Sequence, residues 1–417
     1  MKKVGVSVLC LALSLLLTLG ATSCAASVQA SELSGGYVRN GEAEGALSED
    51  FSAVMANFSF ELFHRTLTED GGNDLISPLS ALLCLALVAN GADGETLAQI
   101  EQTLGMDVDT LNKSLYAYTA SLSDSEDCKM QTANSIWFRD DESLKVKEDF
   151  LQTNADWYGA QVYQAPFDDS TVKDINGWVK KYTDGMIDSI INEIDPSTVM
   201  YLINALVFDA KWQTEYEKDD IRDGTFYNAD GSRTTVDMMY SEESTYLDGD
   251  GFTGFAKKYK GGAYSFVGLL PDENLDVYTL AASLDGEAWT AMWSSRKSAT
   301  VDVGIPEFTY DVNTELTEVL ADMGMTDMFS GATADFSRLG ESAQGNIYCS
   351  SVQQKTFIDV SRNGTKAAAV TVVKMNAECA IEPFEFYRVI LDRPFVYAIV
   401  DNATGLPVFL GAVSHLG

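Results

Sequence analysis

The chain has 417 residues, of which 46% are hydrophobic and 22% are charged, a composition typical of a globular protein rather than a disordered one. Its 28 basic and 62 acidic residues give a formal net charge of −34. Nucleic-acid phosphates are bound by clustered Lys and Arg, so the charge excludes DNA and RNA as partners, and an anionic membrane would repel the protein. We assign the acidity itself to solubility.

The N-terminus has the pattern of an export signal. Two lysines precede an apolar run over residues 4–19, and small residues follow it. We therefore expect residues 1–23 to be a signal peptide. Cys24 resembles the lipidated cysteine of a bacterial lipoprotein, which would tether the protein to the cell surface, and cleavage after Ala30 is the alternative. No second apolar stretch is long enough to span a bilayer.

The rest of the chain is expected to be one domain. Residues 24–46, rich in Ser, Gly, Ala and Glu, read as a flexible tether. No internal repeat and no Pro/Gly-rich linker interrupts the sequence after that point, so we predict a single domain over residues 47–417. We expect it to be a monomer without cofactor or metal.

Helices are predicted first along this domain. Ser48 is a candidate N-cap for a helix with apolar residues at helical spacing from Phe51 onward. Ser77, followed by Pro78, marks the start of a helix that is apolar nearly all round and therefore buried. A third helix is expected over residues 95–104, where Gly105 follows.

Strands dominate later in the chain. Residues 199–208 are almost continuously apolar, which indicates a strand buried on both faces. This order of helices and strands favours an α+β domain. Further strand-like stretches, the last two joined by a hairpin turn, cover residues 265–270, 356–360, 395–400 and 408–413.

The sequence offers little for catalysis or metal binding. Only two histidines are present, His64 and His415, near opposite ends of the domain. There is no G-x-S-x-G turn, phosphate-binding loop or H-E-x-x-H helix. We therefore do not expect an enzyme. The cysteines beyond the signal region lack paired spacing, so we expect free thiols, with Cys84 filling the core: Cys84, Cys128, Cys349 and Cys379.

The segment over residues 364–384 is the most unusual stretch. From Thr365 to Met375, every second residue is uncharged, while Lys366 and Lys374 both fall on the opposite face. The early residues of the uncharged face are small and bury little area. An ordinary surface strand is one interpretation. The other is a strand that lies outside a sheet in one state and inside it in another.

From about residue 47 to residue 413 the chain resembles the serpins. Each matching segment is weak alone, but seven occur in the family's order over more than 300 residues. They are residues 73–80 (NDLISPLS), 133–138 (ANSIWF), 175–179 (INGWV), 183–187 (TDGMI), 202–208 (LINALVF, with Trp212 following), 266–271 (FVGLLP) and 393–395 (RPF).

The resemblance implies the serpin fold and mechanism. The fold would have three β-sheets, the largest able to accept the reactive loop, with eight or nine helices and an exposed loop over about residues 362–388. A protease cleaves the loop, which then inserts as a new strand and traps the covalently attached enzyme. The hinge would comprise Gly364, Thr365, Lys366, Ala367, Ala368 and Ala369, where small residues favour an inhibitory member.

Counting by the family's spacing places the scissile bond at Glu378–Cys379. An acidic residue there excludes trypsin-like targets, whose pocket also carries a carboxylate, and favours elastase-like or Glu-preferring serine proteases. A shift of register would make Ala377 or Asn376 the recognised residue instead. Cys379 would serve either as a small apolar side chain or as a redox-sensitive thiol.

The resemblance also names residues that would control opening of the sheet. Ser77, Ser80 and Asn204 match the family's cluster, whereas its usual His is Gln354, which does not titrate.

At the top of the sheet, near Trp212, the family's usual Lys and Glu are replaced by Glu307 and Arg362, so we expect the salt bridge in swapped form. Lys366 replaces a usual Glu on the outward face, where we expect it to be harmless.

These features predict an extracellular, secreted or lipid-anchored inhibitor that traps a serine protease covalently. Two alternatives on the same fold stay open: an inhibitor of cysteine proteases, and a non-inhibitory member that acts as a binding module.

Overall fold

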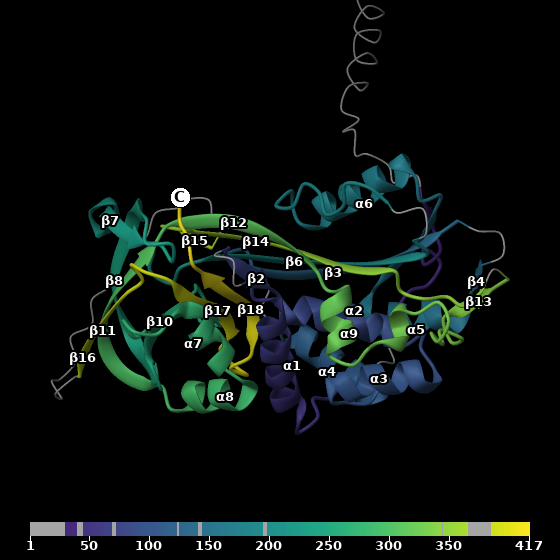
Figure 1. Cartoon of the computed structure of the whole chain (residues 1–417), viewed down its shortest axis with the longest axis horizontal. Coiled ribbons are helices and arrows are strands. Elements are labelled where there is room, and N and C mark those ends of the chain that lie inside the picture. Colours follow the sequence, from purple (N-terminus) through teal and green to yellow (C-terminus); the bar gives the residue numbers. More distant parts are fainter. Residues whose placement is uncertain are drawn as a thin grey trace, which may run out of the picture.

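The computed structural model describes residues 30–39, 45–68, 72–122, 125–140, 144–194, 198–343, 345–365 and 385–417. These residues form a mixed α+β fold with nine α-helices and three β-sheets (Figure 1). The predicted fold class is confirmed. No helix in the described ranges combines the length and apolar character needed to cross a membrane.

The helices pack on both faces of a long central sheet. α6 lies across one face, where Trp178 and Ile175 join a cluster with strand residues such as Trp137 (Figure 1). α1 to α5 lie on the other face. The helices are α1 (Phe51–Thr66), α2 (Pro78–Ala89), α3 (Gly94–Leu104), α4 (Val108–Ser121), α5 (Glu148–Tyr158), α6 (Asp169–Tyr182), α7 (Val277–Ser283), α8 (Gly286–Ser294) and α9 (Thr317–Asp322).

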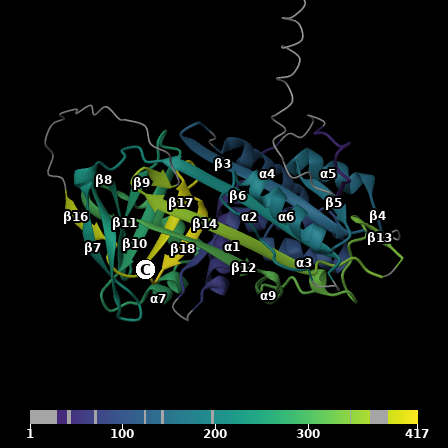
Figure 2. The ribbon, with the colours of Figure 1, turned by 90° about the horizontal axis from the view of Figure 1, so that it is seen from above.

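The central sheet has seven strands, four of them long (Figure 2). In spatial order they are β1 (Ser31–Glu32), β5 (Gln161–Ala165), β3 (Cys128–Arg139), β6 (Met200–Lys211), β15 (Gly364–Thr365), β14 (Ser351–Ser361) and β12 (Phe308–Glu315). The shortest internal strand, β15, separates β6 from β14 at one end. This sheet carries the candidate site.

A second sheet has nine strands. Its longest strand, β8, has 17 residues and pairs with three neighbours along its length: β7, β11 and β9. Its path is β16 (Phe386–Ile390), β11 (Lys297–Pro306), β8 (Arg233–Gly249), β9 (Phe252–Lys258), β10 (Tyr264–Pro271), β17 (Phe395–Asp401), β18 (Pro407–Val413) and β2 (Asp74–Ile76), with β7 (Ile221–Tyr227) beside β8. β4 (Leu144–Val146) and β13 (Gly340–Ser342) form the third sheet, and η1 (Lys218–Asp220) and η2 (Asp327–Phe329) are short 3₁₀ turns.

Helix boundaries follow the local signals in two of the three predicted cases. Ser77 caps α2 by accepting the backbone N–H of Ser80, and all twelve residues of α2 are buried. Gly105 ends α3 in the left-handed region at φ 71°. Ser48, by contrast, does not cap α1. The N-cap is Asp50, without a side-chain hydrogen bond, because residues 48–50 first form a turn in which Phe51 N donates to Ser48 O.

Part of the expected tether lies against the domain. Ser31 and Glu32 pair antiparallel with Gln164 and Tyr163 at the edge of the central sheet. Leu33 N then donates to Val162 O at 2.7 Å. The composition of this segment indicates flexibility, but backbone pairing at a sheet edge needs no particular side chains, so composition alone does not predict it.

Candidate functional site

The hinge residues Gly364 and Thr365 lie inside the central sheet. Thr365 pairs with Ala210 of β6 and with Val360 of β14, and Gly364 pairs with Lys211 and Ser361. Both pairings are antiparallel. β15 is therefore a two-residue strand bonded on both sides, at the end where β6 and β14 are separated.

Glycine is required at the first of these positions. Gly364 has φ 149°, and a Cβ there would lie 2.1 Å from the backbone oxygen of Ala210. Thr365 is buried, and its hydroxyl lies 2.6 Å from the hydroxyl of Tyr259. Burial raises the pKa of Tyr259 well above its usual value, so its hydroxyl stays protonated and able to hold Thr365.

Trp212 packs beside the turn at residues 362–363, which joins β14 to β15. Its ring stacks on Tyr259 with centroids 4.6 Å apart and planes at 9°. The indole N–H donates to Ser361 O at 2.8 Å, and the backbone N–H donates to Asn363 O at 3.0 Å. Sequence reasoning placed Trp212 at the top of the sheet but did not identify Tyr259, which no local motif marks.

Glu307 and Arg362 lie together beside the same turn. The Glu307 carboxylate accepts the backbone N–H of Arg362 at 3.0 Å, and the guanidinium Nε lies 3.6 Å from the same oxygen. The two charges thus form the swapped pair expected from the sequence. The structure adds that the carboxylate also holds the backbone.

The four residues of the expected sheet-opening cluster also lie close together. The Gln354 side chain accepts the Ser77 N–H at 3.0 Å and donates to Ser77 O at 2.9 Å. Ser80 Oγ donates to Asn204 Oδ1, and Asn204 Nδ2 donates to Asn134 Oδ1. Asn134 is a fifth member that sequence reasoning missed, although it lies within the motif at residues 133–138.

This cluster lies where β6 and β14 come into direct contact. The two strands pair in parallel through Tyr201–Ser351, Leu202–Val352 and Ile203–Gln353. Beyond these pairs, the described parts of the strands form no further pair with each other, and the next partners are those of β15. Among the described residues, 204–209 of β6 are therefore not paired with 354–359 of β14.

Several predicted site residues cannot be placed. The hinge residues Lys366, Ala367, Ala368 and Ala369, the expected reactive bond Glu378–Cys379, and Cys24 lie outside the described residues. The expectations for them stay predictions.

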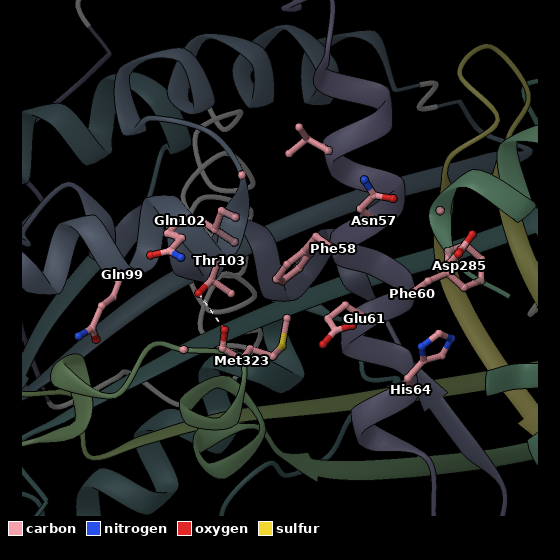
Figure 3. A pocket seen from close by; sticks show the side chains of 15 residues that line it. Asn57, Phe58, Phe60, Glu61, His64, Gln99, Gln102, Thr103, Asp285 and Met323 are labelled. Atoms are coloured by element: carbon pink, nitrogen blue, oxygen red, sulfur yellow. Dashed lines mark hydrogen bonds between the residues drawn. The ribbon is translucent and has the colours of Figure 1, made fainter. Parts of the chain in front are cut away.

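Cys84 and His64 do not belong to a recognisable catalytic group in the part of the chain that the structure describes. Cys84 is buried, and burial raises its pKa to about 12, so its thiol is unreactive. His64 lies beside a cavity of about 590 Å³ between α1, α3 and α8, where its Nε2 lies 2.7 Å from Leu284 O (Figure 3). The described residues that line this cavity include no serine or cysteine.

A metal centre is not formed by the described residues either: no group of three or more His, Cys, Asp or Glu is placed to hold an ion there.

Comparison with known proteins agrees with this geometry. A family model described as Serpin (serine protease inhibitor) matches residues 53–416. Human Serpin B8 is 30% identical over 380 residues, which cover 88% of this chain and 99% of that protein.

Two solved structures of one relative are especially informative. The thermophilic serpin tengpin in its native state has a TM-score of 0.88 at 46% identity, over 93% of this chain and 100% of that chain. Tengpin in its latent state has a TM-score of 0.80 at 44% identity, over 90% of this chain and 100% of that chain. The present structure is more similar to the native form than to the latent one.

Proposed function

Because the chain belongs to the serpin family, we propose that it is an irreversible suicide-substrate inhibitor of extracellular serine proteases. A target protease would attack the loop at Glu378–Cys379 and become acylated on its serine. The loop would then enter the central sheet as a new strand before water can hydrolyse the acyl-enzyme. The inhibitor is consumed together with its target, so there is no turnover.

The observation that carries this proposal is the position of β15. Gly364 and Thr365 are bonded to both β6 and β14, and among the described residues those two strands pair directly with each other only at residues 201–203 and 351–353. Each backbone hydrogen bond contributes about 1 kcal/mol net. A strand of roughly ten residues that is bonded on both sides would gain on the order of 10 kcal/mol. That gain is large enough to drive a change of conformation.

Target choice would depend on Glu378. Its carboxylate suits a protease whose primary pocket prefers Glu, or an elastase-like pocket that accepts an adjacent residue such as Ala377. A pocket that carries its own carboxylate would place two desolvated negative charges together, which disfavours trypsin-like enzymes.

We place this inhibitor outside the cell. The proposal rests on the export pattern of residues 1–23, with attachment through Cys24 or release after Ala30. Mass spectrometry of the mature N-terminus from the native host distinguishes the two: a diacylated Cys24 indicates attachment, and an unmodified Ser31 indicates release.

The direct test is incubation of the purified protein with a panel of elastase-like, Glu-specific and papain-like proteases. We expect an SDS-stable complex with a serine protease of the first two groups, and a released C-terminal peptide that begins at Cys379. A complex only with papain-like enzymes would instead identify a cysteine-protease inhibitor. Cleavage without any stable complex would identify a substrate or a binding module and would refute the proposal.

A matched pair of variants tests whether insertion is needed. Thr365→Arg places a charge at a buried hinge position, where an unpaired charge costs several kcal/mol. We expect this variant to be cleaved without forming complex. Asn363→Arg adds the same charge two residues earlier, in the half-buried turn, and should retain most complex formation. Equal complex formation by both variants would contradict the insertion step.

A further inference from the structure

A lysine is buried close to the turn that joins β14 to β15. Only 2% of Lys257, on β9, is exposed to solvent. Its ammonium lies 2.7 Å from the carboxylate of Glu243 on β8 and 3.4 Å from the hydroxyl of Ser241. Lysine is almost never buried to this extent, and a buried ion pair usually stabilises a fold no better than apolar side chains of the same size. A role in stability alone therefore does not account for Lys257.

Two aromatic rings also contact this ammonium. Its nitrogen lies 4.4 Å from the ring centroid of Tyr216 and 5.3 Å from that of Trp212. At both distances a cation is attracted to the face of an aromatic ring. The Tyr216 hydroxyl, in addition, lies 3.2 Å from the hydroxyl of Ser241. We call the residues around the ammonium the lysine cage: Glu243, Ser241, Tyr216 and Trp212.

The two aromatic residues of the lysine cage hold the β14–β15 turn. Trp212 donates its indole N–H to Ser361 O at 2.8 Å and its backbone N–H to Asn363 O at 3.0 Å. Tyr216 donates its backbone N–H to Arg362 O at 3.1 Å. Three consecutive carbonyl groups are thus bound by two residues whose rings share one ammonium.

Trp212 is contacted by two residues of the same strand. Tyr259 stacks on its ring with centroids 4.6 Å apart, and Lys257 places the ammonium over it. Lys257 and Tyr259 are two positions apart on neighbouring points of the β9 chain, so their side chains leave it on the same side. The position of Trp212 therefore depends on a charge as well as on ring stacking.

We propose that Lys257 is a positioning residue for the β14–β15 turn. Held by Glu243, its ammonium fixes the rings of Trp212 and Tyr216 relative to each other. The three N–H donors of these two residues are thereby kept in line with the carbonyl groups of residues 361–363. The inference goes beyond the proposed function, because it concerns the described form alone and its tests need no protease.

Removing the ion pair as a unit separates positioning from stability. Lys257→Met combined with Glu243→Gln replaces two buried charges by uncharged groups of similar size, a change that is often neutral for global stability. We expect the guanidinium unfolding midpoint to change little. Backbone amide exchange of Trp212 and Tyr216 should become about fivefold faster or more, because the attraction of both rings to the ammonium is lost.

The amides of Ile175 and Trp178 in α6 serve as the internal reference, and they should keep their wild-type exchange rates. Equal acceleration at these amides and at Trp212 and Tyr216 would show that the ion pair only stabilises the fold. Unchanged exchange at Trp212 and Tyr216 would show that the ammonium does not position them. Either result would overturn the inference.

Lys258→Met is the matched control. It removes the same charge from the next residue of β9, whose side chain is exposed and leaves the strand on the opposite side. Exchange at Trp212 and Tyr216 should stay at the wild-type rate. Acceleration as large as that caused by removing Lys257 and Glu243 would assign the effect to net charge rather than to the lysine cage.

Chemical rescue separates the charge of Lys257 from its packing. A cavity of about 300 Å³ adjoins the lysine cage and is lined by Lys257, Glu243 and Tyr216 among others, so a small molecule can reach the space that Lys257→Ala leaves. We expect n-propylammonium to slow the exchange of Trp212 and Tyr216 in this variant. The uncharged n-propanol, which has a similar shape, should not. Equal recovery with both compounds, or recovery with neither, would refute the role of the ammonium.

Discussion

Gln354 shows how much a single side chain contributes to the site. Its amide satisfies both the N–H and the C=O of Ser77 at the start of α2, in a place where only 3% of the residue is exposed. An amide accepts and donates at every pH. The cluster therefore keeps its hydrogen bonds across the physiological range, whereas an imidazole at the same place would lose an acceptor on protonation.

This contrast predicts the behaviour of Gln354→His. A neutral imidazole can accept from Ser77 N–H, but a protonated one cannot, so the folded-state pKa of the new histidine would fall below its unfolded value of about 6.5. Stability should be complete above about pH 6.5 and should decline as the pH falls below it, by about 1–3 kcal/mol. Thermal midpoints at pH 8 and pH 5.5 measure this difference. An identical pH profile for the variant and the wild type would contradict it.

A second ion pair lies beside the hinge, where the Lys211 ammonium is 2.6 Å from the Asp127 carboxylate and Lys211 is also the strand partner of Gly364. This pair is insensitive to pH over the same range. The hydrogen bond from Lys211 lowers the pKa of Asp127, and the same bond raises the pKa of Lys211. Stabilisation by a depressed carboxyl is lost only as the pH falls below its unfolded value of about 3.9. Stabilisation by a raised ammonium is lost only as the pH rises above about 10.4. Between these limits the pair stays charged.

At the scale of elements, the turn between β14 and β15 is the part that sets the hinge. Three separate groups hold it: Trp212 binds Ser361 and Asn363, Tyr259 holds Thr365, and Glu307 binds Arg362. Trp212 and Tyr259 are buried, whereas the Arg362 side chain is 46% exposed. The backbone contact of Glu307 should therefore contribute more than its salt bridge, since half-exposed ion pairs contribute little.

This ranking predicts a graded series of variants. Arg362→Ala should lower stability by less than about 1 kcal/mol, because only the exposed pair is lost. Glu307→Gln retains an acceptor for the Arg362 N–H, so its loss of stability should also be small. Glu307→Ala removes that acceptor and should lower the free energy of unfolding by about 1–2 kcal/mol. Hydrogen exchange of the Arg362 amide should quicken only in Glu307→Ala. An equal increase of the exchange rate over the wild type in all three variants would show that the salt bridge, not the backbone contact, holds the turn.

At the scale of the whole molecule, net charge governs encounters rather than the fold. A formal charge of −34 produces a negative field that attracts cationic proteins and repels anionic ones. Above about 0.1 M salt, screening confines this field to roughly 10 Å. If the proposed function holds, the field would add a second level of target choice to the one that Glu378 would provide.

Association rates should reveal this second level. For a basic target protease we expect the rate of complex formation to fall about tenfold or more between roughly 20 mM and 300 mM NaCl. For an acidic protease with the same pocket preference the rate should rise over the same range. Stopped-flow measurements with a displaced fluorogenic substrate give both rates. Rates independent of salt for both enzymes would mean that the field has no part in target choice.

Most of the fold could be predicted from local patterns. Ser77 and Pro78 start α2, Gly105 ends α3, and the apolar run at residues 199–208 becomes β6, because each signal acts within a few residues. The order of the seven family motifs predicted the architecture. These are properties of the chain itself.

Other features arise only when distant segments meet. β1 pairs with β5 across more than 120 residues, Tyr259 reaches Thr365 across 106, and Asn134 joins Asn204 across 70. The sequence around each residue does not determine which distant residue it pairs with, because backbone pairing is nearly independent of the side chains involved. The hinge is the clearest case. From sequence alone Thr365 is one small residue in a loop, and only the tertiary structure pairs it with Ala210 on one side and Val360 on the other.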